Sequence, residues 1–242
     1  MYGIKQTKDL RTMDIRCSIT HHPCIQFYNI DASAIGLVRD FIDTETTDTG
    51  AVHISFNYKE PYNMKTASRL HVNLDYERVI NVSKEDVGIV WSNNLGLELC
   101  TEVLVFNDPL ECLSYISLRK NLDLFTGIAI LPRTFKREHI LIVKELFPFA
   151  RPVCSFGQGQ LASLQDAQFY LVHTERDMEI DITYGLDGIK ISDKKGKVRF
   201  YDVFSLRCLI RDFYGNKYKS GPITIKPLKK YKSFKVESCQ KK

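Results

Sequence analysis

Three corners in the middle of the chain carry the side chains best suited to chemistry. Each corner follows a short apolar segment and precedes a helical pattern. Carboxylates in such positions can hold a divalent cation or exchange protons, and glycine amides at a helix start can contact phosphate. The corners are Asn107-Asp108-Pro109-Leu110-Glu111, Pro132-Arg133-Thr134 and Gly157-Gln158-Gly159-Gln160.

The elements that must position these corners alternate between strand and helix. The apolar runs 103–106, 127–131 and 151–156 predict strands, and 109–122, 135–147 and 160–172 predict helices. Almost continuously apolar strands separated by amphipathic helices indicate a parallel sheet that is buried on both faces. Ligands of such sheets gather outside the carboxyl ends of the strands, so we expect the three corners to meet there.

The corner residues resemble a known family. VFNDPLECLSY (105–115) resembles the first motif of Toprim domains, and CSFGQGQLASLQDAQ (154–168) resembles the second. The resemblance covers about 100–172, and 25–99 is similar to the lead-in of primase-like proteins of Bacteroidetes mobile elements. It implies a Toprim fold and a link to nucleic acid.

The same resemblance implies a degenerate site. Toprim domains use a glutamate as general acid and base and a D-x-D pair as Mg²⁺ ligands. Here Asn107 stands at the glutamate position, and Gly157 and Gly159 stand at the aspartate positions. Asp108 and Glu111 are the acids left at the first corner. We therefore expect no catalytic residue, no metal and no cofactor at this edge.

The positive charge is concentrated at the C-terminus. The net charge is +5, yet 217–242 contains nine lysines and one acid, Glu237. A basic arm with interleaved aromatic rings is typical of contact with nucleic acid, and a solvated terminus or rings that anchor the last strand are the alternatives. The predicted nucleic-acid-binding residues are Arg133, Lys136, Lys226, Lys229, Lys230, Tyr231, Lys232 and Lys235.

Two other functions remain open. The segment His53-Ile54-Ser55 matches one half of the pattern of 2H phosphoesterases, in which paired histidines act as general acid and base. His71 and His173 are the candidates for the second histidine. The other alternative is a structural or inhibitory protein that binds a protein partner and no nucleic acid.

The cysteines and hydropathy indicate a cytoplasmic protein without a membrane segment. The seven cysteines form no C-x-x-C pair, and the first 14 residues lack the apolar core of a signal peptide. Cys17, His21, His22 and Cys24 lie close together, but their spacing is not that of a structural zinc site.

The predicted fold class is mixed α/β. A small parallel Toprim-like core with helices on both faces is flanked by N-terminal strands and a C-terminal antiparallel segment. We expect an early strand at 25–30, a helix within 32–43, a strand at 51–58 and a late helix at 203–214. The predicted blocks are 1–99, 100–172, 173–216 and the basic tail 217–242.

Overall fold

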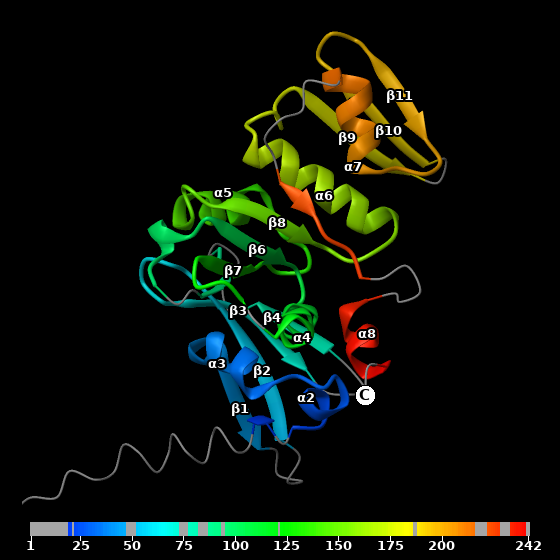
Figure 1. Cartoon of the computed structure of the whole chain (residues 1–242). Coiled ribbons are helices and arrows are strands. Elements are labelled where there is room, and N and C mark those ends of the chain that lie inside the picture. Colours follow the sequence, from blue (N-terminus) through cyan, green and yellow to red (C-terminus); the bar gives the residue numbers. More distant parts are fainter. Residues whose placement is uncertain are drawn as a thin grey trace, which may run out of the picture. The chain divides into compact units, whose positions relative to one another are not determined.

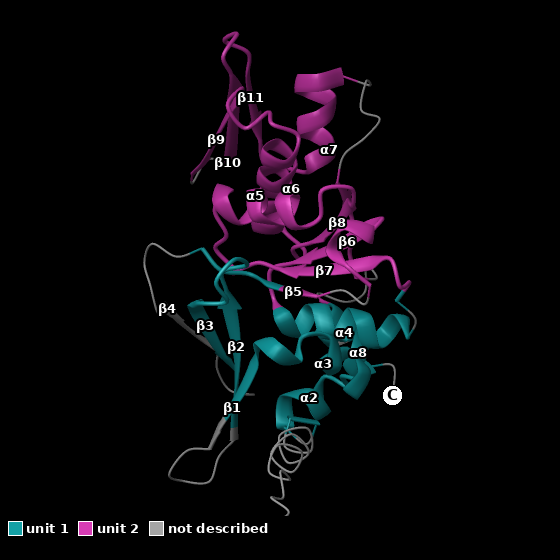
Figure 2. Ribbon diagram, turned by 90° about the vertical axis from the view of Figure 1, so that its left-hand side faces the viewer, with its two compact units in different colours: residues 1–90, 109–122, 234–242 teal, residues 91–108, 123–233 magenta. Residues whose placement is uncertain are grey.

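The computed structural model describes most of the chain and divides it into two compact units (Figures 1 and 2). The described residues are 19–20, 22–46, 52–72, 77–81, 87–92, 95–120, 122–185, 188–215, 222–227 and 233–240. Unit 1 comprises 1–90, 109–122 and 234–242, and unit 2 comprises 91–108 and 123–233. Each unit is therefore assembled from segments that lie far apart in the sequence.

Unit 1 contains an antiparallel sheet, and its described strands follow the order β1-β2-β3-β4. Alternation places Ile54, Phe56, Leu70 and Val72 on one face, and all four are buried. The strands are β1 (Ile42–Thr46), β2 (Val52–Lys59), β3 (Thr66–Val72) and β4 (Glu77–Asn81). The clean alternation at 51–58 predicted β2 correctly.

Helix α2 of unit 1 corrects a prediction. The strand expected at 25–30 is wrong, because Pro23–Phe27 forms the short helix α2. The His22 side chain accepts a hydrogen bond from the backbone N–H of Cys24, and Pro23 occupies the first turn, where its missing N–H costs nothing. Helix α3 (Ala32–Leu37) and the 3₁₀ turn η1 (Arg39–Phe41) then replace the single helix expected within 32–43.

Two helices from distant parts of the sequence pack together in unit 1. Helix α4 (Pro109–Arg119) lies beside α8 (Phe234–Gln240), as Figure 2 shows. The Tyr115 and Phe234 rings meet edge to face at 4.9 Å, and the backbone N–H of Phe234 donates to Glu111 Oε2 at 2.7 Å. The described part of the basic C-terminus is therefore built into the fold.

Unit 2 contains the predicted parallel strands. Among the described residues, the sheet has the order β12-β8-β6-β7-β5, and β6 pairs in parallel with both β7 and β8. These strands are β5 (Val90–Ser92), β6 (Glu102–Phe106), β7 (Thr126–Ile130), β8 (Arg151–Ser155) and β12 (Ile223–Thr224). Every residue of β7 is buried, as a strand covered on both faces requires.

The helices of unit 2 connect the strands of this sheet. The 3₁₀ turn η2 (Leu97–Leu99) precedes β6, and α5 (Arg137–Leu146) and α6 (Gln160–His173) flank β8 in the sequence. Helices α5 and α6 pack side by side. Strand β12 pairs in parallel with β8 and extends the sheet beyond it.

A second, antiparallel sheet completes unit 2. Its described strands are β9 (Ile180–Gly185), β10 (Gly188–Asp193) and β11 (Val198–Tyr201), in the order β11-β10-β9. One face packs on α6 and on α7 (Leu206–Leu209), which continues as the π-helical turn η3 (Ile210–Tyr214). Ile189, Ile191 and Leu209 are buried in this contact. The observed architecture confirms the predicted mixed α/β class with flanking antiparallel strands.

Candidate functional site

The carboxyl ends of β6, β7 and β8, where the three predicted corners begin, lie side by side at one edge of the parallel sheet. Phe106, the last residue of β6, lies opposite Ser155 of β8 and Ile130 of β7. Asn107 and the loop that contains Gly157 therefore follow neighbouring parallel strands. The backbone N–H of Leu131 also donates to the carbonyl of Phe106 at 2.7 Å, which ties the second corner to the first.

Hydrogen bonds connect the polar side chains at this edge to one another. The amide of Asn107 donates to Gln165 Oε1 at 3.0 Å, and Gln165 Nε2 donates to the carbonyl of Arg133 at 2.7 Å. Arg133 Nη2 donates to the buried carboxylate of Asp108 at 2.8 Å. Asn107, Asp108, Arg133 and Gln165 form what we call the edge network. Gln165 belongs to α6, and no motif in the sequence indicates its role.

The two glycines of the third corner are explained by backbone conformation. Gly157 has φ +91°, and Gly159, at the start of α6, has φ +95° and ψ −178°. The second combination is essentially restricted to glycine. A Cβ at either position would meet no atom within 4 Å, so the limit is the backbone and not the space. An aspartate at position 159 would be strained in this loop.

The acids at this edge do not form a cage for a metal ion. The described residues contain no group of three or more histidine, cysteine, aspartate or glutamate side chains arranged to hold one. Asp108 contacts a guanidinium, and Glu111 belongs to unit 1, where it binds the start of α8. The described acids at this edge therefore do not provide the several oxygen ligands that a hard divalent cation needs.

The predicted phosphate-binding residues have different surroundings. The Arg133 side chain is 46% exposed although it contacts Asp108. Lys136 is exposed, and its backbone N–H donates to His139 Nδ1 at 3.0 Å at the start of α5. In unit 1, Lys235 Nζ lies 5.6 Å from the centre of the Tyr28 ring. The predicted residues Lys229, Lys230, Tyr231 and Lys232 lie outside the described residues.

Lys226 forms an ion pair with a buried acid. Its Nζ lies 2.8 Å from Asp166 Oδ2, and the Asp166 side chain is only 4% exposed. Burial raises the pKa of Asp166, and the nearby ammonium of Lys226 acts in the opposite direction. Asp166 Oδ1 has no hydrogen-bond partner among the described residues. The Lys226 ammonium is thus the described group that compensates this buried carboxylate.

The polar face of the unit 1 sheet brings two of the predicted histidines close together. Ser55 lies opposite His71 in the β2–β3 register, and its Oγ is 2.8 Å from His71 Nδ1. His53 is two residues from Ser55 and shares its face, so His53 and His71 are diagonal neighbours. Ser55 is fully buried, whereas both histidines are partly exposed. His173 stacks on Phe169 in unit 2 instead.

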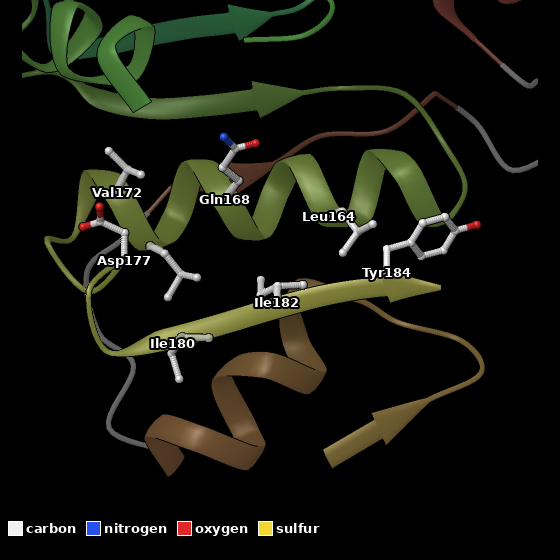
Figure 3. Close-up of a pocket in the computed structure, with 8 residues that line it drawn as sticks. Leu164, Gln168, Val172, Asp177, Ile180, Ile182 and Tyr184 are labelled. Carbon is white, nitrogen blue, oxygen red and sulfur yellow. The ribbon is translucent and has the colours of Figure 1, made fainter. Parts of the chain in front are cut away.

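A pocket of about 340 Å³ lies between α6 and β9 in unit 2 (Figure 3). Its walls are mainly apolar side chains, including Leu164 and Ile182, and Tyr184 lies near one end. Asp177 is its acid, and Asp177 Oδ2 accepts a hydrogen bond from Arg137 at 2.7 Å. The lining therefore offers shape and apolar contact and no group of catalytic side chains.

The comparisons with known proteins give only distant similarities. No family model matches the chain, and no curated protein matches it. Among solved structures, the chain is similar to the primase fragment of the bacteriophage T7 primase-helicase protein, with a TM-score of 0.47 and 11% identity. That match covers 61% of this chain, and the chain spans 58% of the fragment.

A second similar structure comes from the same phage. It contains the T7 lagging-strand DNA polymerase interacting with primase domains of two gp4 subunits bound to an RNA/DNA hybrid and dTTP. The TM-score is 0.43 at 10% identity, and the match covers 61% of this chain and 68% of the other. Likeness at this level is too distant to say anything about the chemistry of this chain.

Proposed function

We propose that the chain is a nucleic-acid-binding protein that catalyses no phosphoryl or nucleotidyl transfer. It is built on a Toprim-like fold that lacks the metal-binding acids, and it acts in a mobile element or a phage. The observation that carries the proposal is the edge network, in which Asn107 binds Gln165 and Asp108 binds Arg133. The polar groups at the usual ligand edge of the sheet bind each other.

Two physical features support the absence of catalysis. The amide of Asn107 cannot exchange protons near neutral pH, so it cannot serve as a general acid or base. An aspartate at position 159 would be strained, because the backbone of Gly159 has a conformation that favours glycine. A hard divalent cation needs several oxygen ligands, and this position therefore supplies none. The expected result is no turnover of nucleoside triphosphates or oligonucleotides with Mg²⁺ or Mn²⁺.

The charge distribution supports nucleic acid as the ligand. The basic C-terminal region would contact phosphates through Lys229, Lys230 and Lys232, with Tyr231 available for stacking. Arg133 and Lys136 are exposed on unit 2 and would add phosphate contacts there. Lys226 and Lys235 belong to the same predicted set, although the first already pairs with Asp166.

The test is a salt titration of binding to labelled single- and double-stranded oligonucleotides. Lys229→Gln/Lys230→Gln should lower the slope of log affinity against log salt by about 1.4 to 1.8, because each lost phosphate contact contributes about 0.7 to 0.9. Lys65→Gln/Lys120→Gln changes the net charge equally at two other exposed sites and should leave the slope almost unchanged. Equal slopes for both double variants would refute the role of the C-terminal lysines.

A phosphoesterase of the 2H type is the second candidate, because His53 and His71 share one face of neighbouring strands. Under this hypothesis, His53→Ala abolishes hydrolysis of a cyclic phosphodiester while the thermal unfolding temperature stays unchanged. His173→Ala is the matched control, since the His173 ring stacks on Phe169 of its own helix. Wild-type protein without turnover would exclude this candidate.

The third candidate is a structural or inhibitory protein that binds a protein partner. Affinity purification from a lysate, with and without nuclease treatment, separates it from the proposal. Nucleic acid that co-purifies and is lost after nuclease supports nucleic-acid binding. A protein partner that survives nuclease, together with no affinity for any oligonucleotide, supports the third candidate.

A further inference from the structure

The antiparallel sheet of unit 2 has one face that no described residue covers. The β10 residues Lys190 and Ser192 point to this face, as do their neighbours on β9 and β11. It consists of two rows, Thr183-Lys190-Phe200 and Asp181-Ser192-Val198, which we call the open face. The opposite face is buried against α6 and α7.

An aromatic ring stands exposed on this open face. The Phe200 side chain is 72% exposed, whereas Phe204, three residues beyond the end of β11, is buried in the core of the same sheet. An exposed phenylalanine on a regular strand contributes little to folding, since its apolar surface remains in water. Its position is therefore informative about binding.

A lysine lies beside the ring. Lys190 lies directly opposite Phe200 in the register, and its Nζ is 6.0 Å from the ring centre. The turn after β10 adds the exposed Lys194 and Lys195, whereas Arg199 pairs with Ile191 on the opposite face. The carboxylate of Asp193 accepts the backbone N–H groups of Lys195 and Lys197, so this acid serves the turn.

We propose that the open face binds single-stranded nucleic acid, with a base stacked on Phe200 and phosphates contacted by Lys190, Lys194 and Lys195. This proposal rests on the proposed nucleic-acid binding and gives it a site and a strand type. Bases of any sequence stack on an aromatic ring, whereas the bases of a duplex are already stacked and paired. The cations favour a polyanion over an apolar protein partner.

The geometry suits a strand that runs along the sheet. Lys190 and the turn residue Lys194 are four residues apart, which corresponds to about 13 Å of extended chain. A bound backbone would follow β10 from the Phe200 row toward the Lys194-Lys195 turn, and Ser192 would lie beneath it. Asp181, on β9 in the second row, is the acid of the face and repels phosphate on that side.

The test is fluorescence anisotropy with a labelled oligothymidylate, which forms no secondary structure, on the full chain. Phe200→Ala should weaken binding roughly 5- to 150-fold, the range that corresponds to the loss of one stacked base. Lys190→Gln should lower the salt slope by about 0.7. Phe149→Ala removes an equally exposed ring, 79% exposed, from a loop of unit 2 and should bind like wild type.

The outcomes separate this proposal from the proposed function. Because Phe200 is exposed, Phe200→Ala should keep the unfolding temperature of the wild type, which circular dichroism checks. If the wild type binds the oligonucleotide but Phe200→Ala binds equally well, the open face is refuted and nucleic-acid binding stands. If the wild type binds neither the oligonucleotide nor a duplex, both proposals are overturned. If the wild type has no affinity for nucleic acid but co-purifies with a protein partner, and Phe200→Ala no longer binds that partner, the open face binds a protein.

Discussion

The edge network and the open face are both in unit 2, and they differ in what their side chains contact. At the edge of the parallel sheet, Asn107 and Asp108 contact Gln165 and Arg133. On the open face, Phe200 and Lys190 lie beside each other and are both exposed. The edge is where ligands of parallel sheets usually bind, yet the open face has more exposed binding groups. Position within a fold does not by itself make a site.

The largest expected effect concerns Lys226, which separates structural from binding lysines. Lys226→Met removes the cation next to the buried Asp166 carboxylate and should lower the free energy of unfolding by about 3 kcal/mol. Lys195→Met, in an exposed turn, should change it by less than about 0.5 kcal/mol. Chemical denaturation measures both. Similar small losses would show that Lys226 is a surface lysine, as the charge pattern alone suggests.

The pH dependence of the free energy of unfolding tests the role of His139 at the start of α5. Burial lowers the pKa of His139 to about 4, and Lys136 contributes with its charge. Between pH 6.5 and 4 the unfolded chain binds a proton that the folded chain does not, so stability falls as the pH falls through this window. The stability gained on deprotonation is complete above pH 6.5 and amounts to roughly 3 kcal/mol.

Protonation has a structural reason to destabilise α5, because His139 Nδ1 then can no longer accept the N–H of Lys136. His139→Gln should reduce the pH dependence of the denaturation midpoint between pH 4 and 6.5. A midpoint that depends on pH equally in the variant and the wild type would assign the effect to other groups.

The next effect tests whether a carboxylate added at this edge can create a metal site. Gly159→Asp should lower the free energy of unfolding by about 2 kcal/mol, because a residue with a Cβ is strained at φ +95° and ψ −178°. Mg²⁺ should not restore the lost stability in thermal unfolding. If Mg²⁺ restored the stability of Gly159→Asp, the loop would be able to adapt to a metal ion. The edge of the parallel sheet would then be a potential binding site, as the open face is.

The smallest stability effects contrast the two regions directly. Arg133→Met removes a contact to the buried Asp108 and should lower the free energy of unfolding by about 1 kcal/mol. Lys190→Met should change stability by less than about 0.5 kcal/mol, while it weakens oligonucleotide binding. Denaturation and anisotropy on both variants would show whether Lys190 contributes to binding alone, whereas Arg133 contributes to stability as well.

The N-terminal and C-terminal segments show where local pattern was insufficient. Residues 25–30 have strand propensity, but the cap at His22 and the proline at position 23 set a helix at Pro23–Phe27. For 217–242 the sequence left open a basic arm, a solvated terminus or rings that anchor the last segment, and Phe234 is buried against Tyr115 and begins α8. The burial of Phe234 depends on a contact with a distant segment, which charge and periodicity do not show. The cap at His22 and Pro23 is a local signal, which the strand propensity of 25–30 outweighed in the prediction.

The sequence by itself determined the alternation of strand and helix from 103 to 173, the location of the three corners and the residues Asn107, Gly157 and Gly159 that stand in them. Period and composition are local properties, so they can be read without a fold. Only the tertiary structure decided that Gln165 joins Asn107 to Arg133, that Lys226 compensates Asp166, and that Phe200 faces solvent beside Lys190. These facts depend on register and helix packing, which bring together residues that no short sequence pattern connects.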